Sequence, residues 1–444
     1  MMANSDPGCF GFSARAARTA KQPISYLMTQ AVDNPDVISL AAGFVDTPTL
    51  PDAEAAGLLA DLLGGAQGSK LPLQYGTTEG NAELRTLLLE HLARLDGVDP
   101  AEIHASADDI VVTTGSQQLL FMLTDVLVDP GDIVLTSWPS YFVYAGALQT
   151  FGAEVRCVDM DDEGVVPAAL EALLGQLAAE GRLPRVKLLY LCDYHQNPTG
   201  ISLSAQRRPA LLDIIRRYST HHRILIIEDA AYRELTYEGR PAPSLRRYDT
   251  ENRFVALVQT FSKPFAPGIK TGYGLLPRGL AEAVVLQKGN HDFGSANLCQ
   301  HVVLAAMKHG VYARHVQELR RRYAAKRDAM LAALDEHLGD FGPGHTRWTR
   351  PSGGLYIWLT LPAELDTGPD SPLFQKALDN GVLYVPGAYC FPDDPTRTAP
   401  TNTMRLSYGM SPIGEIQEGI ARLAAAIRDQ ADASPTPAMP ASPA

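Results

Sequence analysis

The sequence predicts an α/β fold, in which a mainly parallel sheet forms a large domain and a smaller α+β domain accompanies it. Two observations lead to this class. Short β-rich runs alternate with helical patterns between about residues 109 and 260, as in an α/β sandwich. Several runs, such as 224–227, are continuously aliphatic, as expected of strands buried on both faces of a parallel sheet.

Six strands are expected in this region, separated by helical patterns. In chain order they are Asp109–Thr113, Ile133–Thr136, Glu154–Val158, Val186–Cys192, Arg223–Glu228 and Phe254–Thr260. The helical patterns include Gln117–Leu127 and Ala205–Tyr218, and Ser204 is the expected N-cap of the second. Ligands of open parallel sheets bind beyond the carboxyl ends of the strands, so a site is expected in the loops there.

The pattern changes after about residue 310. A long charged helix is expected at Val311–Leu338, followed by a strand-and-turn region around Ser352-Gly353-Gly354. A final helix is expected at Ile413–Asp429.

The domain prediction follows from this change. Residues 50–310 form the expected large domain, and residues 311–430 form the small one. Residues 13–49 are expected to be an N-terminal arm or lid that joins the small domain. The ends, 1–12 and 431–444, consist mostly of small and polar residues or of Ala, Pro and Ser, and are predicted to be disordered.

Composition argues against several classes of function. The 444 residues carry a net charge of −12, which disfavours nucleic-acid and anionic-membrane partners. The five cysteines are scattered and never spaced C-x-x-C, which favours a reducing compartment and predicts no disulfide framework and no metal site. Residues 1–22 lack the apolar core of a signal peptide, and no stretch approaches the ~20 apolar residues of a membrane span. We expect a cytoplasmic protein.

The strand ends carry the residues that point to chemistry. Gly115 and Ser116 follow the first strand at a helix N-terminus, where they could bind a phosphate or merely cap the helix. Asn197 lies in a Pro-Gly turn and could either shape that turn or face a ligand. Asp229 ends an apolar strand, where a carboxylate needs a partner, which could be a helix end or a protonated ring nitrogen.

Two cationic residues stand out from the rest. Lys263 directly follows a buried strand and is flanked by hydroxyl residues, unlike an ordinary surface lysine. Arg405 lies inside a short strand-like run, where it needs an anionic partner.

These motifs together resemble a known family. In order, they are S-Q-Q (116–118), N-P-T-G (197–200), D-x-x-Y (229–232), S-K-x-x-A-P-G (262–268) and R-L-S (405–407). The set is similar to the fold-type-I pyridoxal-phosphate (PLP) aminotransferases of class I/II, the group with kynurenine, 2-aminoadipate and aromatic aminotransferases. The resemblance extends from about Ser13 to Arg428, and the ordered set is far more specific than any single motif.

The resemblance implies a role for each residue. Lys263 would form the internal aldimine with PLP and later carry the proton between Cα and C4′. Asp229 would keep the pyridine nitrogen protonated. Asn197 and Tyr232 would hydrogen-bond the phenolic oxygen of the cofactor. Tyr141 would stack on the ring, although taken alone it is equally well explained as a core aromatic.

The resemblance also implies how both anionic groups are bound. The phosphate candidates are Gly115, Ser116, Gln117, Thr260, Ser262 and Lys270, with Tyr75 lent across the interface of an obligatory homodimer. Arg405 would clamp the α-carboxylate of an amino acid or 2-oxo acid in a bidentate pair, with Asn197 and Gly43 lining the same pocket.

Three positions depart from the family pattern. Lys270 stands where Arg is usual, so the phosphate would be held by a point charge with less directional grip. Thr260 replaces the commoner Ser and keeps the hydroxyl. Ser25, in an expected lid at 22–25, stands near where relatives that accept acidic side chains can carry Arg, which disfavours 2-aminoadipate or glutamate.

The expected function is amino-group transfer between an L-amino acid and a 2-oxo acid by a ping-pong mechanism. The alternative is a PLP-dependent lyase, decarboxylase or oxidase, because the fold does not fix the reaction. A regulatory PLP-binding domain is disfavoured, since only about fifty residues precede Leu50 and leave no room for a DNA-binding module.

Overall fold

The computed structural model describes residues 10–19, 29, 34, 36–64, 69–342 and 345–433. Most of the two expected disordered ends, namely 1–9 and 434–444, and the expected lid at 22–25 lie outside the described residues. The final helix is α13 (Ile413–Ala433), which is longer than expected. Its last residues, Ala431-Asp432-Ala433, read as part of the tail by composition but continue the helix.

A sheet of eight strands forms the centre of the larger part of the molecule. Its order is β2 (Ile110–Thr113), β9 (Gly272–Leu275), β8 (Val255–Thr260), β7 (Leu225–Asp229), β6 (Val186–Cys192), β3 (Ile133–Trp138), β4 (Glu154–Asp161) and β5 (Gly164–Val165). The run from β4 through β3, β6 and β7 to β8 is parallel, as predicted. All six expected strands are present, and the mainly parallel α/β architecture is confirmed.

Strand β9 was not expected, and it runs antiparallel to both β2 and β8. Its sequence, Gly-Tyr-Gly-Leu, has two glycines and therefore looks like a turn. The glycines are needed for packing: a Cβ at Gly274 would lie 2.4 Å from Leu119 Cδ2, and one at Gly272 would lie 2.5 Å from the backbone nitrogen of Ser116.

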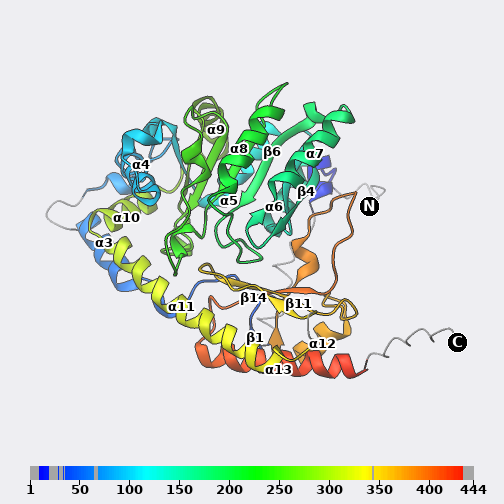
Figure 1. The fold of residues 1–444 in the computed structure, drawn as a ribbon. Coiled ribbons are helices and arrows are strands. Elements are labelled where there is room, and N and C mark those ends of the chain that lie inside the picture. Colours follow the sequence, from blue (N-terminus) through cyan, green and yellow to red (C-terminus); the bar gives the residue numbers. More distant parts are fainter. Residues whose placement is uncertain are drawn as a thin grey trace.

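Helices cover both faces of this sheet (Figure 1). Alternate residues of β3 belong to opposite apolar clusters: Val134 packs in one, and Ile133 and Leu135 pack in the other. The helices on the Val134 face include α5 (Gly115–Leu127), α6 (Phe142–Phe151) and α9 (Arg278–His291), and those on the other face are α7 (Pro167–Ala179) and α8 (Arg207–Tyr218).

The expected cap of α8 is wrong. The helix begins at Arg207, two residues later than predicted, and its N-cap is Gln206. Ser204 Oγ is buried and has no hydrogen-bond partner within the described residues. Near the β2 edge, three helices build a further apolar cluster, namely α3 (Asp52–Gly64), α4 (Ala82–Asp96) and α10 (Asn297–Lys308).

The second part of the molecule follows the long helix α11 (Val311–Leu338), which has the predicted bounds. It contains a four-stranded antiparallel sheet of β10 (Arg347–Trp348), β11 (Tyr356–Thr360), β14 (Thr403–Ser407) and β13 (Val385–Pro386). Helices α12 (Pro372–Asp379) and α13 pack together, and α11 also packs on α13. Figure 1 shows α11 running along the side of the molecule from α3 and α10 to this second sheet.

The N-terminal segment divides between the two parts. Strand β1 (Ile38–Ser39) pairs in parallel with β12 (Val382–Leu383), which supports our proposal that the arm joins the small domain. The short helix α1 (Ala14–Arg18) instead contacts α6, and Arg15 forms an ion pair with Asp125 of α5. No helix in the described part of the chain is long and apolar enough to cross a membrane.

Candidate active site

A cavity of about 310 Å³ lies at the carboxyl ends of the parallel strands, facing the second sheet. It brings together all the predicted site residues except Tyr75. The predicted residues that line it are Gly43, Gly115, Ser116, Gln117, Tyr141, Asn197, Asp229, Tyr232, Thr260, Ser262, Lys263, Lys270 and Arg405. The ends of β7 and β8 deliver Asp229 and Lys263, whereas Arg405 comes from β14 of the other sheet.

The amine of Lys263 lies in the cavity and is held by the N-terminal segment. Its Nζ donates a hydrogen bond to the carbonyl oxygen of Gly43, 2.7 Å away. Gly43 leaves no room for a side chain, because a Cβ there would lie 2.7 Å from the Tyr356 hydroxyl. Gly43 and Lys263 both line the cavity, so a side chain at position 43 would also take up ligand space.

Asp229 is a buried carboxylate with hydrogen-bond donors but no cationic partner among the residues that the structure describes. Its Oδ2 accepts from the Tyr190 hydroxyl at 2.8 Å, and its Oδ1 accepts from the Ala231 N–H at 3.3 Å. Burial raises the pKa of Asp229 from 3.8 to about 6, and the two hydrogen bonds offset only part of that effect. A cationic N–H placed beside this carboxylate would complete its environment.

Arg405 lines the cavity from the second sheet and is almost fully buried. Its Nη1 donates to Asn197 Oδ1 at 2.8 Å, and its Nη2 donates to the Ala41 carbonyl oxygen at 2.7 Å. The guanidinium also lies 4.4 Å from the centre of the Tyr356 ring. Its Nε is buried and has no hydrogen-bond partner within the described residues.

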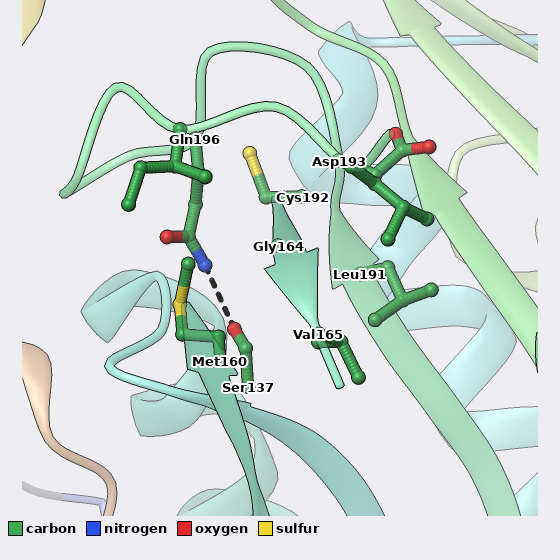
Figure 2. A pocket seen from close by; sticks show the side chains of 10 residues that line it. Ser137, Met160, Gly164, Val165, Leu191, Cys192, Asp193 and Gln196 are labelled. Atoms are coloured by element: carbon green, nitrogen blue, oxygen red, sulfur yellow. Dashed lines mark hydrogen bonds between the residues drawn. The ribbon is translucent and has the colours of Figure 1, made fainter. Parts of the chain in front are cut away.

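The turn that carries Asn197 is braced from below by Gln196 (Figure 2). Gln196 Nε2 donates to Ser137 Oγ at 2.7 Å and to the Pro139 carbonyl oxygen at 3.2 Å. The Thr199 hydroxyl donates to Oε1 of the same Gln196 amide at 2.5 Å. Through these bonds Gln196 joins the loop after β6 to the loop after β3.

A separate cavity of only about 10 Å³ lies beside Gln196 and Ser137, and its volume is at the lower limit for one water molecule.

Two tyrosines surround the centre of the cavity. Tyr141 lies at the N-terminus of α6, and burial raises its pKa above the ordinary value for tyrosine. The hydroxyl of Tyr232 lies 3.1 Å from that of Tyr356, and burial, followed by the proximity of Tyr356, raises the pKa of Tyr232 well above its ordinary value. Both phenols are neutral donors at physiological pH.

The part of the cavity next to the N-terminus of α5 is lined by backbone N–H groups and hydroxyls. Gly115 begins α5 with a φ of +73°, a conformation that favours glycine, and Ser116 follows it. Thr260 Oγ1 donates to Ser262 Oγ at 3.0 Å and accepts from the Ser262 N–H at 3.1 Å. Lys270 is exposed and supplies a cation at the rim. The N-terminus of α5, the hydroxyls and the ammonium together suit a phosphate.

Tyr75 lies outside the cavity and is 83% exposed. Its ring meets Phe293 edge-on, with 5.7 Å between the ring centres. The role implied for Tyr75 requires a second subunit, so it remains a proposal.

Several lining residues were missed, among them Phe44, Phe142, Val143, Cys192 and Tyr356. Phe44 directly follows Gly43, and this adjacency was an available signal. Tyr356 reaches the site only because β11 pairs with β14, in a register that sets Trp358 opposite Arg405. A strand register between segments about fifty residues apart leaves no signal in a single sequence.

The cavity fits PLP on three independent grounds. It contains the Lys263 amine, which can bond a carbonyl carbon, and the buried Asp229 carboxylate, which has no cationic partner in the described part of the chain. It also contains the helix N-terminus and hydroxyls suited to a phosphate. Across the described ranges, no three His, Cys, Asp or Glu side chains are grouped so that they could hold a metal ion.

Comparisons with known proteins agree with this geometry. Residues 35–423 match the model of the family "Aminotransferase class I and II". An aromatic-amino-acid aminotransferase of Thermococcus litoralis is 33% identical over 94% of each chain, and a 2-aminoadipate transaminase of Thermus thermophilus is 32% identical over 94% of this chain and 96% of its own. The crystal structure of a kynurenine aminotransferase of Pyrococcus horikoshii in complex with PMP superposes with a TM-score of 0.84. That protein is 32% identical, with 95% of this chain and 97% of the other covered.

Proposed function

Because this chain belongs to the class I and II aminotransferases and is a PLP-dependent enzyme of fold type I, we propose that its cavity assigns a defined step to each predicted residue. The family supports amino-group transfer rather than the lyase, decarboxylase or oxidase alternative. One observation carries the assignment: a single cavity holds the Lys263 amine, the buried Asp229 carboxylate and the buried Arg405 guanidinium.

Lys263 is the residue that moves the proton. When bound, PLP supplies an electron sink for the pair of electrons that remains at the substrate Cα after deprotonation. Lys263 holds the cofactor in the resting enzyme and, once released, takes the proton from Cα as a general base. Its hydrogen bond to the Gly43 carbonyl shows that the free amine has an acceptor within the cavity.

The other residues orient the reactants. Asp229 accepts the ring N–H, and its lack of another cation within the described residues favours that partner. Asn197 and Tyr232 donate to the phenolic oxygen, and Tyr141 packs on the ring face. Arg405, which lines the cavity, binds the substrate carboxylate through its guanidinium charge.

The phosphate group is bound at the α5 end. Gly115, Ser116 and Gln117 offer the helix N-terminus, and Thr260 and Ser262 offer hydroxyls. Lys270 contributes a charge that solvent screens, because it is exposed.

We propose that the donor carries an apolar or aromatic side chain. Phe44, Phe142, Val143 and Tyr356 line the cavity, and the rings of Phe142 and Tyr356 lie against the Arg405 guanidinium. Its cationic lining residues in the described chain are Lys263, Lys270 and Arg405, and all three already have roles. A side-chain carboxylate would therefore lack a partner there. The relative named as an aromatic-amino-acid aminotransferase supports this choice.

We further propose that the enzyme is a homodimer in a reducing compartment, the cytoplasm. Leu71, Leu73, Tyr75 and Phe293 expose most of their apolar surface, which a second subunit would cover. The partner's phosphate site would then receive Tyr75. The cysteines are scattered and never spaced C-x-x-C, which favours a reducing compartment.

The test is a half-reaction without acceptor. The purified holoenzyme is mixed with single amino acids and the cofactor absorbance is recorded, followed by addition of a 2-oxo acid. We expect an aromatic donor to convert the cofactor to its amino form and the 2-oxo acid to reverse the change. Lys263→Ala should lose both responses, whereas Lys308→Ala, which removes an exposed ion pair with Glu83, should keep them. Release of ammonia or carbon dioxide instead would refute the aminotransferase assignment.

A further inference from the structure

His195 is a buried imidazole that lies outside the cavity, two residues before Asn197. It is 2% exposed and has a backbone φ of +45°, which is unusual for a residue with a side chain. Its Nδ1 lies 3.2 Å from Ser202 Oγ, and its Nε2 lies 2.9 Å from Thr236 Oγ1. Both ring nitrogens therefore have partners.

The hydrogen bonds of those partners define the tautomer. Thr236 Oγ1 donates its hydrogen to the Arg233 carbonyl oxygen at 2.9 Å, so towards His195 it can only accept. The imidazole must then carry its hydrogen on Nε2. Ser202 Oγ accepts the His195 backbone N–H at 2.9 Å, and its own hydrogen is free to be donated to Nδ1. Every hydrogen in this network is thus used once.

The ring packs against two glycines of the second part of the molecule. A Cβ on Gly353 would lie 2.4 Å from His195 Nε2, and one on Gly354 would lie 2.6 Å from His195 Cβ. The same segment is joined to the loop that follows β7 by the bridge between Thr236 and Gly353 and by the bond from the Gly354 N–H to the Leu235 carbonyl oxygen. His195 therefore fills the junction between the two sheets.

Both sides of this junction contact Arg405, the proposed ligand of the substrate carboxylate. On one side, Asn197 accepts the hydrogen bond of Arg405. On the other side, Tyr356 follows the glycines by two residues and packs on the Arg405 guanidinium. The two sides also touch directly, since a Cβ on Gly200 would lie 2.6 Å from the Tyr356 carbonyl oxygen.

We propose that His195 is a positioning residue for substrate binding: a neutral imidazole protonated at Nε2 fastens the Asn197 turn to the Gly353–Gly354 segment. This sets the position of Arg405 relative to the cofactor end of the cavity. The inference rests on the proposed role of Arg405 as the carboxylate ligand. His195 itself touches neither reactant.

The neutral form is favoured by its surroundings. Burial, and then the charge of Arg327 on α11, lower the pKa of His195 to about 3. Arg327 is held in place, because its Nη1 donates to the Pro351 carbonyl oxygen at 2.9 Å and its Nη2 donates to Glu238 at 2.5 Å. A second proton would place a like charge beside this guanidinium and turn Nδ1 from an acceptor into a donor.

The first test measures carboxylate affinity in the holoenzyme. The probe is 3-phenylpropanoate, a carboxylate with no amino group to transfer, and its dissociation constant is read from the cofactor absorbance. We expect His195→Leu, which removes both ring bonds at similar volume, to weaken binding about five- to tenfold. His195→Gln retains an N–H where Nε2 lies and should restore binding to within about twofold. Because Lys263 and Asp229 do not contact His195, PLP affinity should fall much less than affinity for 3-phenylpropanoate, even though the turn also carries Asn197.

A merely structural role would give a different result. Loss of PLP affinity and of thermal stability in His195→Leu, with no selective change for 3-phenylpropanoate, would overturn the inference. If His195→Leu does not fold, Thr236→Val removes the acceptor of Nε2–H together with the bond from Thr236 to the Arg233 carbonyl oxygen, and it should weaken probe binding about two- to threefold. Unchanged binding in that variant would equally overturn it.

The tautomer is tested by nitrogen NMR of the holoenzyme labelled in histidine. The resonance lost in His195→Gln identifies the residue, and we expect an Nε2–H imidazole that does not titrate between pH ~5 and ~9. An Nδ1–H form or a titrating ring refutes the assignment. Arg405→Lys separates the two proposals. If it weakens probe binding but His195→Leu does not, the His195 inference fails; if Arg405→Lys has no effect, the proposed carboxylate site fails.

Discussion

Replacing Asp229 by asparagine should stabilise the cofactor-free protein and at the same time abolish its activity. In the folded protein the pKa of Asp229 is raised by burial from 3.8 to about 6. The unfolded chain releases the same proton at the lower pKa, so at neutral pH the ionised carboxylate destabilises the fold. The difference between the folded and unfolded pKa of Asp229, slightly more than two units, corresponds to about 3 kcal/mol of unfolding free energy.

The sign and the pH window follow from which pKa is higher. Because the folded-state value is the higher one, the cost of the carboxylate is nearly absent below pH ~3.8, grows up to about pH 6 and is constant above. Asparagine cannot ionise, and it can keep both contacts: its oxygen can accept from the Ala231 N–H while its amide donates to the Tyr190 hydroxyl. The gain should be ~1 kcal/mol at pH ~4.5 and ~3 kcal/mol at pH ~7.5.

The assay is urea denaturation of the cofactor-free wild type and of Asp229→Asn, at one protein concentration and both pH values. The matched control is Asp249→Asn. Asp249 is equally buried, but its carboxylate accepts three backbone N–H bonds, from Arg253, Phe254 and Val255. This control should lose ~1–3 kcal/mol. An equal gain for Asp229→Asn at both pH values, or no gain, would refute the reasoning. Transaminase activity of Asp229→Asn should fall at least ~100-fold.

Three further substitutions test the remaining assignments. Arg405→Lys keeps the charge but loses the fork, so kcat/KM should fall ~10–100-fold, whereas Arg350→Lys, on the exposed ion pair with Asp335, should stay within about twofold. Lys270→Ala should weaken PLP binding by less than about tenfold in equilibrium dialysis, and added salt should shrink the difference, because the ammonium is exposed. Tyr75→Phe should weaken PLP binding severalfold without dissociating the dimer in analytical ultracentrifugation; an unchanged affinity would remove Tyr75 from the site.

The sequence located most of the site because strand ends are easy to recognise. Asp229 and Lys263 each end or follow a buried aliphatic run, so their place at one edge of the sheet follows from the parallel order alone. Arg405 was identified by the opposite signal, a charge inside a strand. Tyr356 has neither signal, because it comes to Arg405 only through strand pairing in the second sheet.

The errors in the fold have similarly local causes. The glycines of β9 look like a turn, although they make room for α5. Ser204 is a good capping residue by type, but α8 begins after Gln206. Composition alone does not place the end of α13, because Ala431-Asp432-Ala433 suit both a helix and a tail. His195 was overlooked because its role depends on two glycines more than 150 residues away.

Backbone carbonyls of residues 41–43 accept hydrogen bonds from both Arg405 and Lys263, and this has a consequence for biosynthesis. Ala41 accepts from Arg405, which is 364 residues later, and Gly43 accepts from Lys263, which is 220 residues later. At ~5–20 residues per second, a ribosome needs roughly 20–70 s to make the chain between Ala41 and Arg405. Throughout that time the Ala41 carbonyl oxygen lacks its Arg405 partner, so a nascent chain can form the predicted phosphate site long before it can bind a substrate carboxylate. Chains that terminate before β14 should therefore retain the large sheet but lack Arg405, and with it the proposed binding site for the substrate carboxylate.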